Sequence, residues 1–123
     1  MIEVTLPWPD KRLSPNSRCH WREKAEAAHL ARWDGGHYTW EVKNAINEWY
    51  SGGLPYKVVA QYTFHPPDRR HRDIDNCLSM MKSTQDGVCS ALGIDDNCIK
   101  RTVLEWGEVV KGGKVVLRLE EME

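Results

Sequence analysis

The segment YKVVAQYTFHPPDRRHRDIDNCL, residues 56–78, carries the strongest structural signal in the chain. Apolar side chains recur at every second position from Val58 to Phe64, which predicts a β-strand over 56–65. A second apolar pattern, at steps of three and four residues, predicts an amphipathic helix over 75–92. Between them, three arginines and a histidine directly precede two aspartates. A strand, a charged loop and a helix therefore form the centre of the predicted fold.

The N-terminal part predicts one strand and two helices. Alternation of apolar residues predicts a strand over 2–8, which Pro9 ends. Strong helix formers predict a helix over 21–33, stopped by Gly35-Gly36. A further apolar stripe predicts a second helix over 37–50.

The C-terminal part predicts two strands, over 98–107 and 114–120, joined by a Gly-Gly turn as a C-terminal β-hairpin. The strand at 56–65, the helix and the strand at 98–107 form a βαβ crossover, so these two strands should be parallel. We therefore expect one α/β (α+β) domain over residues 1–123, with a mixed sheet and the element order β-α-α-β-α-β-β.

Composition places the chain among ordinary globular proteins. It has 123 residues, of which 41% are hydrophobic and 28% charged. No apolar run is long enough to span a membrane, and the N-terminal residues do not follow the pattern of a signal peptide. The four cysteines form no C-x-x-C pair, so we expect free thiols and a cytoplasmic protein.

Charge is distributed unevenly along the chain. The net charge is −1, but residues 1–72 carry 11 Lys and Arg against 8 Asp and Glu, whereas residues 73–123 carry 6 against 10. The basic excess lies mainly in residues 11–24 and 69–72. Phosphate binding depends on such local patches more than on total charge.

Asp73 and Asp75 have two interpretations. One of them, Asp75 by preference, could cap the following helix, which leaves the other without a structural task. Asp95 and Asp96 precede the strand at 98–107. The crossover geometry places this pair at the opposite end of the sheet, where a polar turn is the simplest interpretation.

Lys82 follows Asp75 by seven residues, or about two helical turns, so both lie on nearly the same helix face. Helical side chains lean toward the N-terminus, which directs the ammonium group toward the carboxylates. An ion pair with Asp86 is the alternative.

The motifs HPPDRRHRDIDN and LGIDDN, with a lysine between them and GGKVVLRLEE after them, resemble the RusA family of Holliday-junction resolvases. The N-terminal LPWP, LSPNSRCHW and KAEAA resemble its phage and prophage branch. The resemblance covers nearly the whole chain and is weakest over residues 35–50.

This resemblance implies Mg²⁺-dependent nicking of four-way DNA junctions by a homodimer, with Mn²⁺ as a substitute, in DNA recombination and repair. It implies that Asp73, Asp75 and Asp96 are the catalytic and metal-binding aspartates, and that Lys82 is the catalytic lysine. Loops or the dimer partner would bring Asp96 to the other two.

Two basic segments are candidates for DNA binding. Arg69, Arg70 and Arg72 could hold phosphates beside the aspartates. In the second segment polar and basic groups could meet phosphates and an indole could stack on an unpaired base; its candidate residues are Asn16, Arg18, His20 and Trp21. Two rival functions remain: a nuclease for flap, branched or RNA substrates, and a non-catalytic junction-binding module.

Overall fold

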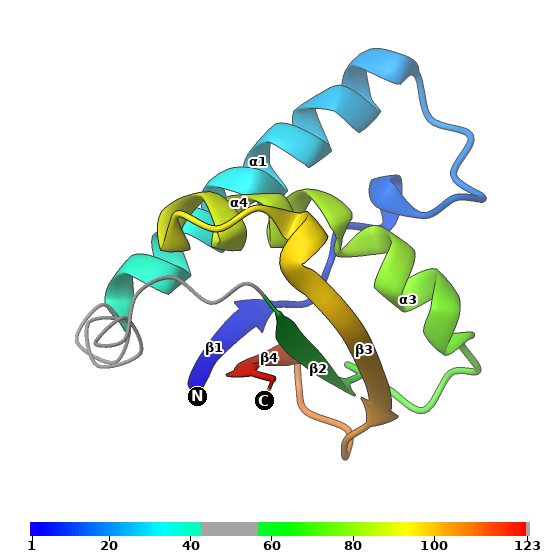
Figure 1. Cartoon of the computed structure of the whole chain (residues 1–123). Helices are drawn as coiled ribbons and strands as arrows, with labels where there is room; N and C mark the ends of the chain where they lie inside the picture. Colours follow the sequence, from blue (N-terminus) through cyan, green and yellow to red (C-terminus); the bar gives the residue numbers. More distant parts are fainter. Residues whose placement is uncertain (43–56, 123) are drawn as a thin grey trace.

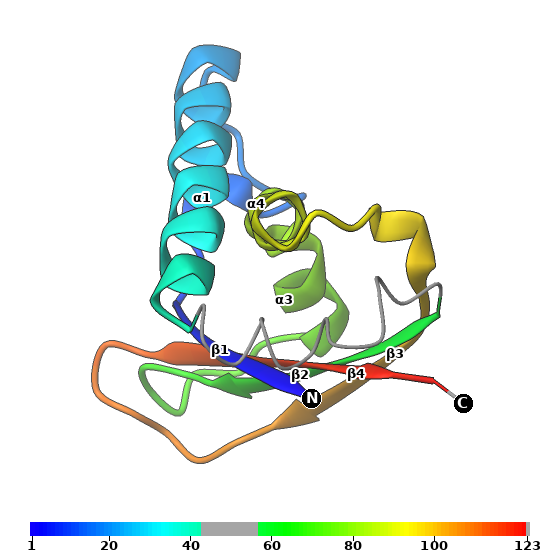
Figure 2. The same cartoon turned by 60° about the vertical axis from the view of Figure 1, so that its left-hand side comes forward.

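The computed structural model describes residues 1–42 and 57–122. Its four strands form one mixed sheet, and the helices α1, α3 and α4 cover one face of that sheet (Figures 1 and 2). The strands are β1 (Ile2–Pro7), β2 (Val58–His65), β3 (Ile99–Trp106) and β4 (Lys114–Glu121). The helices are α1 (Trp21–Glu41), α3 (Ile74–Met80) and α4 (Lys82–Leu92), with short 3₁₀ turns η1 (Lys11–Leu13) and η2 (Asp96–Cys98).

The strand order in the sheet is β1-β4-β2-β3. β2 pairs in parallel with β3 and antiparallel with β4, which also pairs antiparallel with β1. The predicted α+β class, mixed sheet and parallel βαβ crossover are therefore confirmed. β3 is an edge strand, and most of its residues are exposed.

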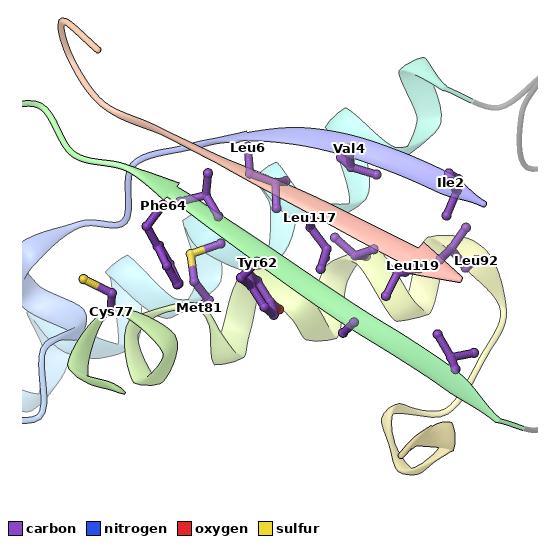
Figure 3. Packing of buried hydrophobic residues seen from close by; sticks show 14 of the residues in the cluster. Ile2, Val4, Leu6, Tyr62, Phe64, Cys77, Met81, Leu92, Leu117 and Leu119 are labelled. Atoms are coloured by element: carbon purple, nitrogen blue, oxygen red, sulfur yellow. The ribbon is translucent and has the colours of Figure 1, made fainter. Parts of the chain in front are cut away.

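The core lies between the sheet and the helices. Alternate residues of β2 are fully buried, as the strand pattern predicts, and they meet apolar side chains from α3 and α4 (Figure 3). The largest buried side chains include Tyr62 and Phe64 of β2, Leu117 and Leu119 of β4, and Met81 and Leu92 from the helical layer.

The predicted stop of the first helix at Gly35-Gly36 is wrong, because α1 continues through both glycines to Glu41. The glycines serve contact between helices. A Cβ atom on Gly35 would lie 2.1 Å from the carbonyl oxygen of Thr84, and one on Gly87 would lie 2.0 Å from that of Arg32. The backbones of α1 and α4 therefore approach closely, and packing outweighs the low helix propensity of glycine. The predicted helix over 37–50 merges with α1 up to Glu41, and its last residues lie outside the described ranges.

The predicted helix over 75–92 is divided in two at Met81, whose backbone (φ −90°, ψ −2°) lies outside regular helical geometry. Met81 is buried among the core residues, and Lys82 begins α4 directly after it. The break gives α3 and α4 different directions, as Figure 1 shows.

The predicted C-terminal hairpin is also wrong, because β2 lies between β3 and β4. The Gly-Gly turn exists, and both Gly112 and Gly113 have positive φ angles that favour glycine. However, the connection 107–113 is too long for a tight hairpin and crosses the end of β2, so that β4 enters the sheet on the far side.

Two other expectations concern the whole chain. All four cysteines are free thiols, as predicted. Within the described residues, no helix combines the length and apolar character that crossing a membrane requires.

The contact between α1 and α4 leads to a stability prediction. Replacing Gly35 with Ala should lower the free energy of unfolding by about 2 kcal/mol or more, because the methyl group would force the helices apart. Gly36→Ala is the matched control: its Cβ would meet only the Gly87 carbonyl oxygen, at 3.7 Å. Urea unfolding should show the control as stable as the parent or more stable, since Ala favours the helix by about 1 kcal/mol. Equal losses in both variants would contradict the close helix contact.

Candidate functional site

The loop over residues 66–73 begins where β2 ends, and Arg72 holds its shape. One guanidinium nitrogen of Arg72 lies 2.9 Å from the Asp68 carboxylate. Another donates to the carbonyl oxygens of Asp68 at 3.2 Å and Arg70 at 3.1 Å. The guanidinium also lies over the indole of Trp8, 5.5 Å from its centroid. Only 19% of the Arg72 side chain is exposed, so this arginine is largely committed to the loop itself.

The connection 107–113 contacts the end of β2, where the same loop begins. The backbone N–H of Gly107 donates to the carbonyl oxygen of Phe64 at 2.8 Å. Nδ1 of His65 lies 3.0 Å from the carbonyl oxygen of Glu108. A Cβ atom on Gly107 would lie only 2.4 Å from the imidazole ring of His65, so glycine permits this close crossing. The chain crossing that rules out a hairpin therefore fixes the base of the arginine-rich loop.

Arg69 and Arg70 differ from Arg72, because both are exposed. The Arg70 side chain is 80% exposed and lies 3.7 Å from the Asp68 carboxylate. No carboxylate in the described ranges lies within ion-pair distance of Arg69. The backbone N–H of Arg70 is the main cause that lowers the pKa of Asp68, followed by the Arg72 guanidinium. Asp68 thus stays charged and organises the loop, while two arginines face the solvent.

Asp73 and Asp75 lie at the start of α3, and neither carboxylate caps the helix. Asp73 occupies the N-cap position, but its side chain makes no capping hydrogen bond. The expectation that Asp75 is the cap is wrong, because Asp75 lies in the first helical turn. Nε2 of His71 lies 3.7 Å from the Asp73 carboxylate. Both aspartates are exposed, so their carboxylate oxygens are available to a ligand.

Asp96 lies at the other end of the parallel strand pair, in η2, just before β3. The Asp95 carboxyl group is the largest cause that raises the pKa of Asp96, with burial and the negative charges of Asp95 and Asp86 adding to it. The positive charge of Lys82 lowers that pKa. Asp96 is therefore within electrostatic reach of Lys82, whereas Asp73 and Asp75 are not among the groups that act on it.

Lys82 is exposed in the first turn of α4. The alternative ion pair with Asp86 is not formed; Asp86 instead faces Arg32, at 3.9 Å. Lys82 thus lies along the chain between the Asp73–Asp75 pair and Asp96, on the helical side of the sheet. Lys82 is within electrostatic reach of Asp96, and Asp96 does not form a group with Asp73 and Asp75 that could hold a metal ion within the described residues.

The carboxylates fit a hard cation such as Mg²⁺. Among residues 1–42 and 57–122, no group of three or more His, Cys, Asp or Glu lies close enough together to hold a metal ion. Mg²⁺ is commonly held by one or two carboxylates together with substrate phosphates, without a complete protein cage. Asp73 and Asp75, exposed and without capping bonds, match this requirement directly behind exposed arginines.

The second candidate segment contains Asn16, Arg18, His20 and Trp21. His20 is the N-cap of α1, and its Nδ1 accepts from the backbone N–H of Arg22 at 3.1 Å. Trp21 is 68% exposed, so it is not a core residue. Its ring lies 5.5 Å from that of His20, and the Arg22 guanidinium lies over it at 5.2 Å from the centroid. This segment follows η1, and η1 contacts α3.

Sequence reasoning missed two tryptophans, Trp8 and Trp106, whose rings pack against Phe64 near the end of β2. Trp8 packs edge-on against Phe64, with ring centroids 6.2 Å apart, and carries the Arg72 guanidinium. Trp106 ends β3 and lies 6.1 Å from Phe64. Both belong to predicted strands, and only the strand order, which sequence did not reveal, places them beside the arginine-rich loop.

The site thus combines exposed carboxylates and exposed guanidinium groups, an arrangement suited to a divalent cation together with a phosphate-bearing ligand.

No family model matches the chain. An uncharacterized protein of Xylella fastidiosa strain Temecula1 is 38% identical over 97% of this chain and 76% of its own length. The crossover junction endodeoxyribonuclease RusA of Escherichia coli strain K12 is 31% identical over 97% of this chain and 93% of its own. That of Enterobacteria phage 82 is 30% identical over the same shares.

These relatives cover nearly the full length of the chain. It belongs to the RusA family of crossover junction endodeoxyribonucleases, as the sequence motifs indicated.

The two kinds of arginine lead to a prediction. Replacing Arg72 with Ala should lower the free energy of unfolding by about 1.5 kcal/mol or more, because a largely buried charged group loses its hydrogen bonds. Arg70→Ala is the matched control and should change it by less than about 0.5 kcal/mol, since its ion pair is exposed. Thermal unfolding followed by circular dichroism measures both. If the two variants unfold alike, Arg72 does not organise the loop.

Proposed function

We propose that this protein is a Mg²⁺-dependent endodeoxyribonuclease that resolves four-way DNA junctions by paired nicks. One observation carries the proposal: Asp73 and Asp75 present exposed carboxylates, free of capping bonds, directly behind an exposed arginine pair. The similarity to crossover junction endodeoxyribonucleases over nearly the full length supports the choice of substrate. The lack of a capping bond speaks against the rival in which these aspartates only cap a helix.

The residues divide the chemistry between them. Arg69 and Arg70 bind the phosphates on either side of the scissile bond, and Arg72 keeps their loop in place. Asp73 and Asp75 would hold the metal ion through their carboxylate oxygens. The ion supplies a water of lowered pKa and stabilises charge on the phosphoryl oxygens. Lys82 adds a positive charge for the transition state.

Asp96 joins the site through the region of Lys82, whose charge already acts on it. Its carboxyl group lies beside that of Asp95, and two adjacent carboxylates repel each other unless a proton or a cation lies between them. A cation would relieve this repulsion. Asp96 is therefore the third carboxylate of the proposed site.

A homodimer suits this function. Resolution of a junction needs two matched nicks in opposed strands, and a twofold axis supplies two equivalent sites. Light scattering in solution measures the number of copies.

The direct test uses a labelled four-way junction with Mg²⁺, beside duplex, flap and RNA controls. Paired symmetric nicks in the junction alone are expected. Cutting of all substrates would favour a nuclease of broader specificity. Binding without cutting in any divalent metal would overturn the enzymatic proposal.

Replacing Asp73 with Asn should abolish cutting, because a metal ligand is lost, while junction binding stays the same or tightens as a negative charge leaves the phosphate site. Glu120→Gln on β4 is a control that should cut normally. Gel mobility and cleavage assays on the same junction separate binding from catalysis. Wild-type cutting by Asp73→Asn would show that the metal site lies elsewhere.

Asp95 and Asp96 form a natural matched pair for the third carboxylate. The Asp95 side chain accepts from the Asn97 backbone N–H at 3.0 Å, which is the main cause of its lowered pKa and gives it a structural task in η2. Asp96→Asn should therefore lose cutting, whereas Asp95→Asn should retain it, because the Asn oxygen can accept the same hydrogen bond. The initial nicking rate at saturating protein measures this difference. The reverse pattern would assign the metal-binding role to Asp95.

A further inference from the structure

A hollow of about 200 Å³ opens between the arginine-rich loop and the end of β3. Its lining is unusual because it combines three guanidinium groups with an indole and two aliphatic side chains. The residues are Pro66, Asp68, Arg69, Arg70, Arg72, Trp106 and Val109. Two segments far apart in sequence, 66–72 and 106–109, therefore meet there, at the end of β2.

Trp106 forms the aromatic wall of this hollow. It is the last residue of β3, and 44% of it is exposed although its ring packs beside Phe64, at 6.1 Å and an interplanar angle of 60°. Phe64 is fully buried and stacks in turn on Tyr62, at 5.8 Å. The core thus holds the indole from one side, and the other side stays open because β3 is the sheet edge.

The arginines of the hollow are one fixed group and two exposed ones. Arg72 is held by Asp68 and by the loop carbonyl oxygens, so it gives the hollow a constant positive wall. Arg69 and Arg70 are exposed and can reach phosphates at its opening. Val109, 44% exposed, adds an apolar surface opposite the charges.

This combination matches one unstacked nucleotide. Aromatic side chains beside a basic groove are the usual means of holding single-stranded nucleic acid, with the base stacked and the backbone held by charge. Arginine also stacks on flat π systems while binding phosphate. The continuous base stack is interrupted at the exchange point of a four-way junction, so a base there leaves the stack at a lower cost than in a continuous duplex.

We infer that the hollow is a stacking pocket for one unpaired nucleobase, and that Trp106 is a DNA-binding residue that positions the strand for the aspartates. Because Arg72 directly precedes Asp73, a base in this pocket places the adjoining phosphate next to the carboxylates. The inference rests on the proposed function and adds a contact that selects branched over continuous DNA. The stacking is tolerant of sequence, since every base has a π face.

An abasic scan of the junction tests the pocket in the wild-type protein. Single abasic sites are placed at each position around the nicked bond, and the affinity for each junction is measured with Mg²⁺ replaced by EDTA. One position should weaken binding by about tenfold, the loss typical of a missing stacked base. If no position weakens binding, the pocket does not hold a base.

A double-mutant cycle connects that position to Trp106. Trp106→Ala should lose about tenfold on the intact junction and nothing further on the abasic one, because both changes remove the same stacking contact. Trp106→Phe should keep most of the affinity. Trp33→Ala, at an exposed tryptophan of α1, is the matched control and should bind normally.

The outcomes separate the two proposals. If wild-type protein fails to nick the junction, the proposed function fails. If it nicks normally while additive losses appear in the cycle, or while Trp106→Phe binds as weakly as Trp106→Ala, the junction nuclease stands and the stacking pocket is overturned. Should Trp106→Ala not fold, the abasic scan and Trp106→Phe still decide.

Discussion

The position of β2 between β3 and β4 is the constraint on which the rest of the structure depends. Because β4 lies beyond β2, the connection 107–113 has to cross the end of that strand. The crossing brings Gly107 under His65 and fixes the start of the arginine-rich loop. It also leaves β3 at the sheet edge, with Trp106 beside the same loop. The strand order therefore brings together the residues of the candidate site.

The local periodicities were sufficient to predict the strands, the parallel crossover and the charged loop with its aspartates. They failed where non-local packing decides. Gly35 and Gly36 are helix breakers by propensity, but a backbone contact with α4 that no single-sequence pattern reveals keeps them in α1. Likewise, a Gly-Gly turn predicts a reversal of the chain but not the strand beside which the chain returns. For the site, the uncommitted Asp73 and the exposed Trp21 needed the structure, since capping and core burial were equally consistent with the sequence.

The charged groups near the end of β2 fall into two functional sets. Arg72 and Asp68 satisfy each other and the loop backbone, and this pair gives the loop a defined shape. Arg69, Arg70, Asp73 and Asp75 remain exposed, and the contacts of Arg70 with Asp68 and of Asp73 with His71 are themselves exposed. A phosphate and a cation, arriving together, would satisfy both signs at once. The presence of both kinds of exposed charge in one segment thus suits a DNA phosphate that binds together with a cation.

This account makes cation binding depend on DNA, because two carboxylates supply only part of a coordination sphere and substrate phosphates supply more of it. Isothermal titration of Mg²⁺ into the protein, alone and with a junction that carries an uncleavable linkage, measures the dependence. We predict that the junction raises the affinity for Mg²⁺ by about tenfold, and that Mg²⁺ raises the affinity for the junction by the same factor. An affinity for Mg²⁺ that is the same with and without the junction would contradict the account.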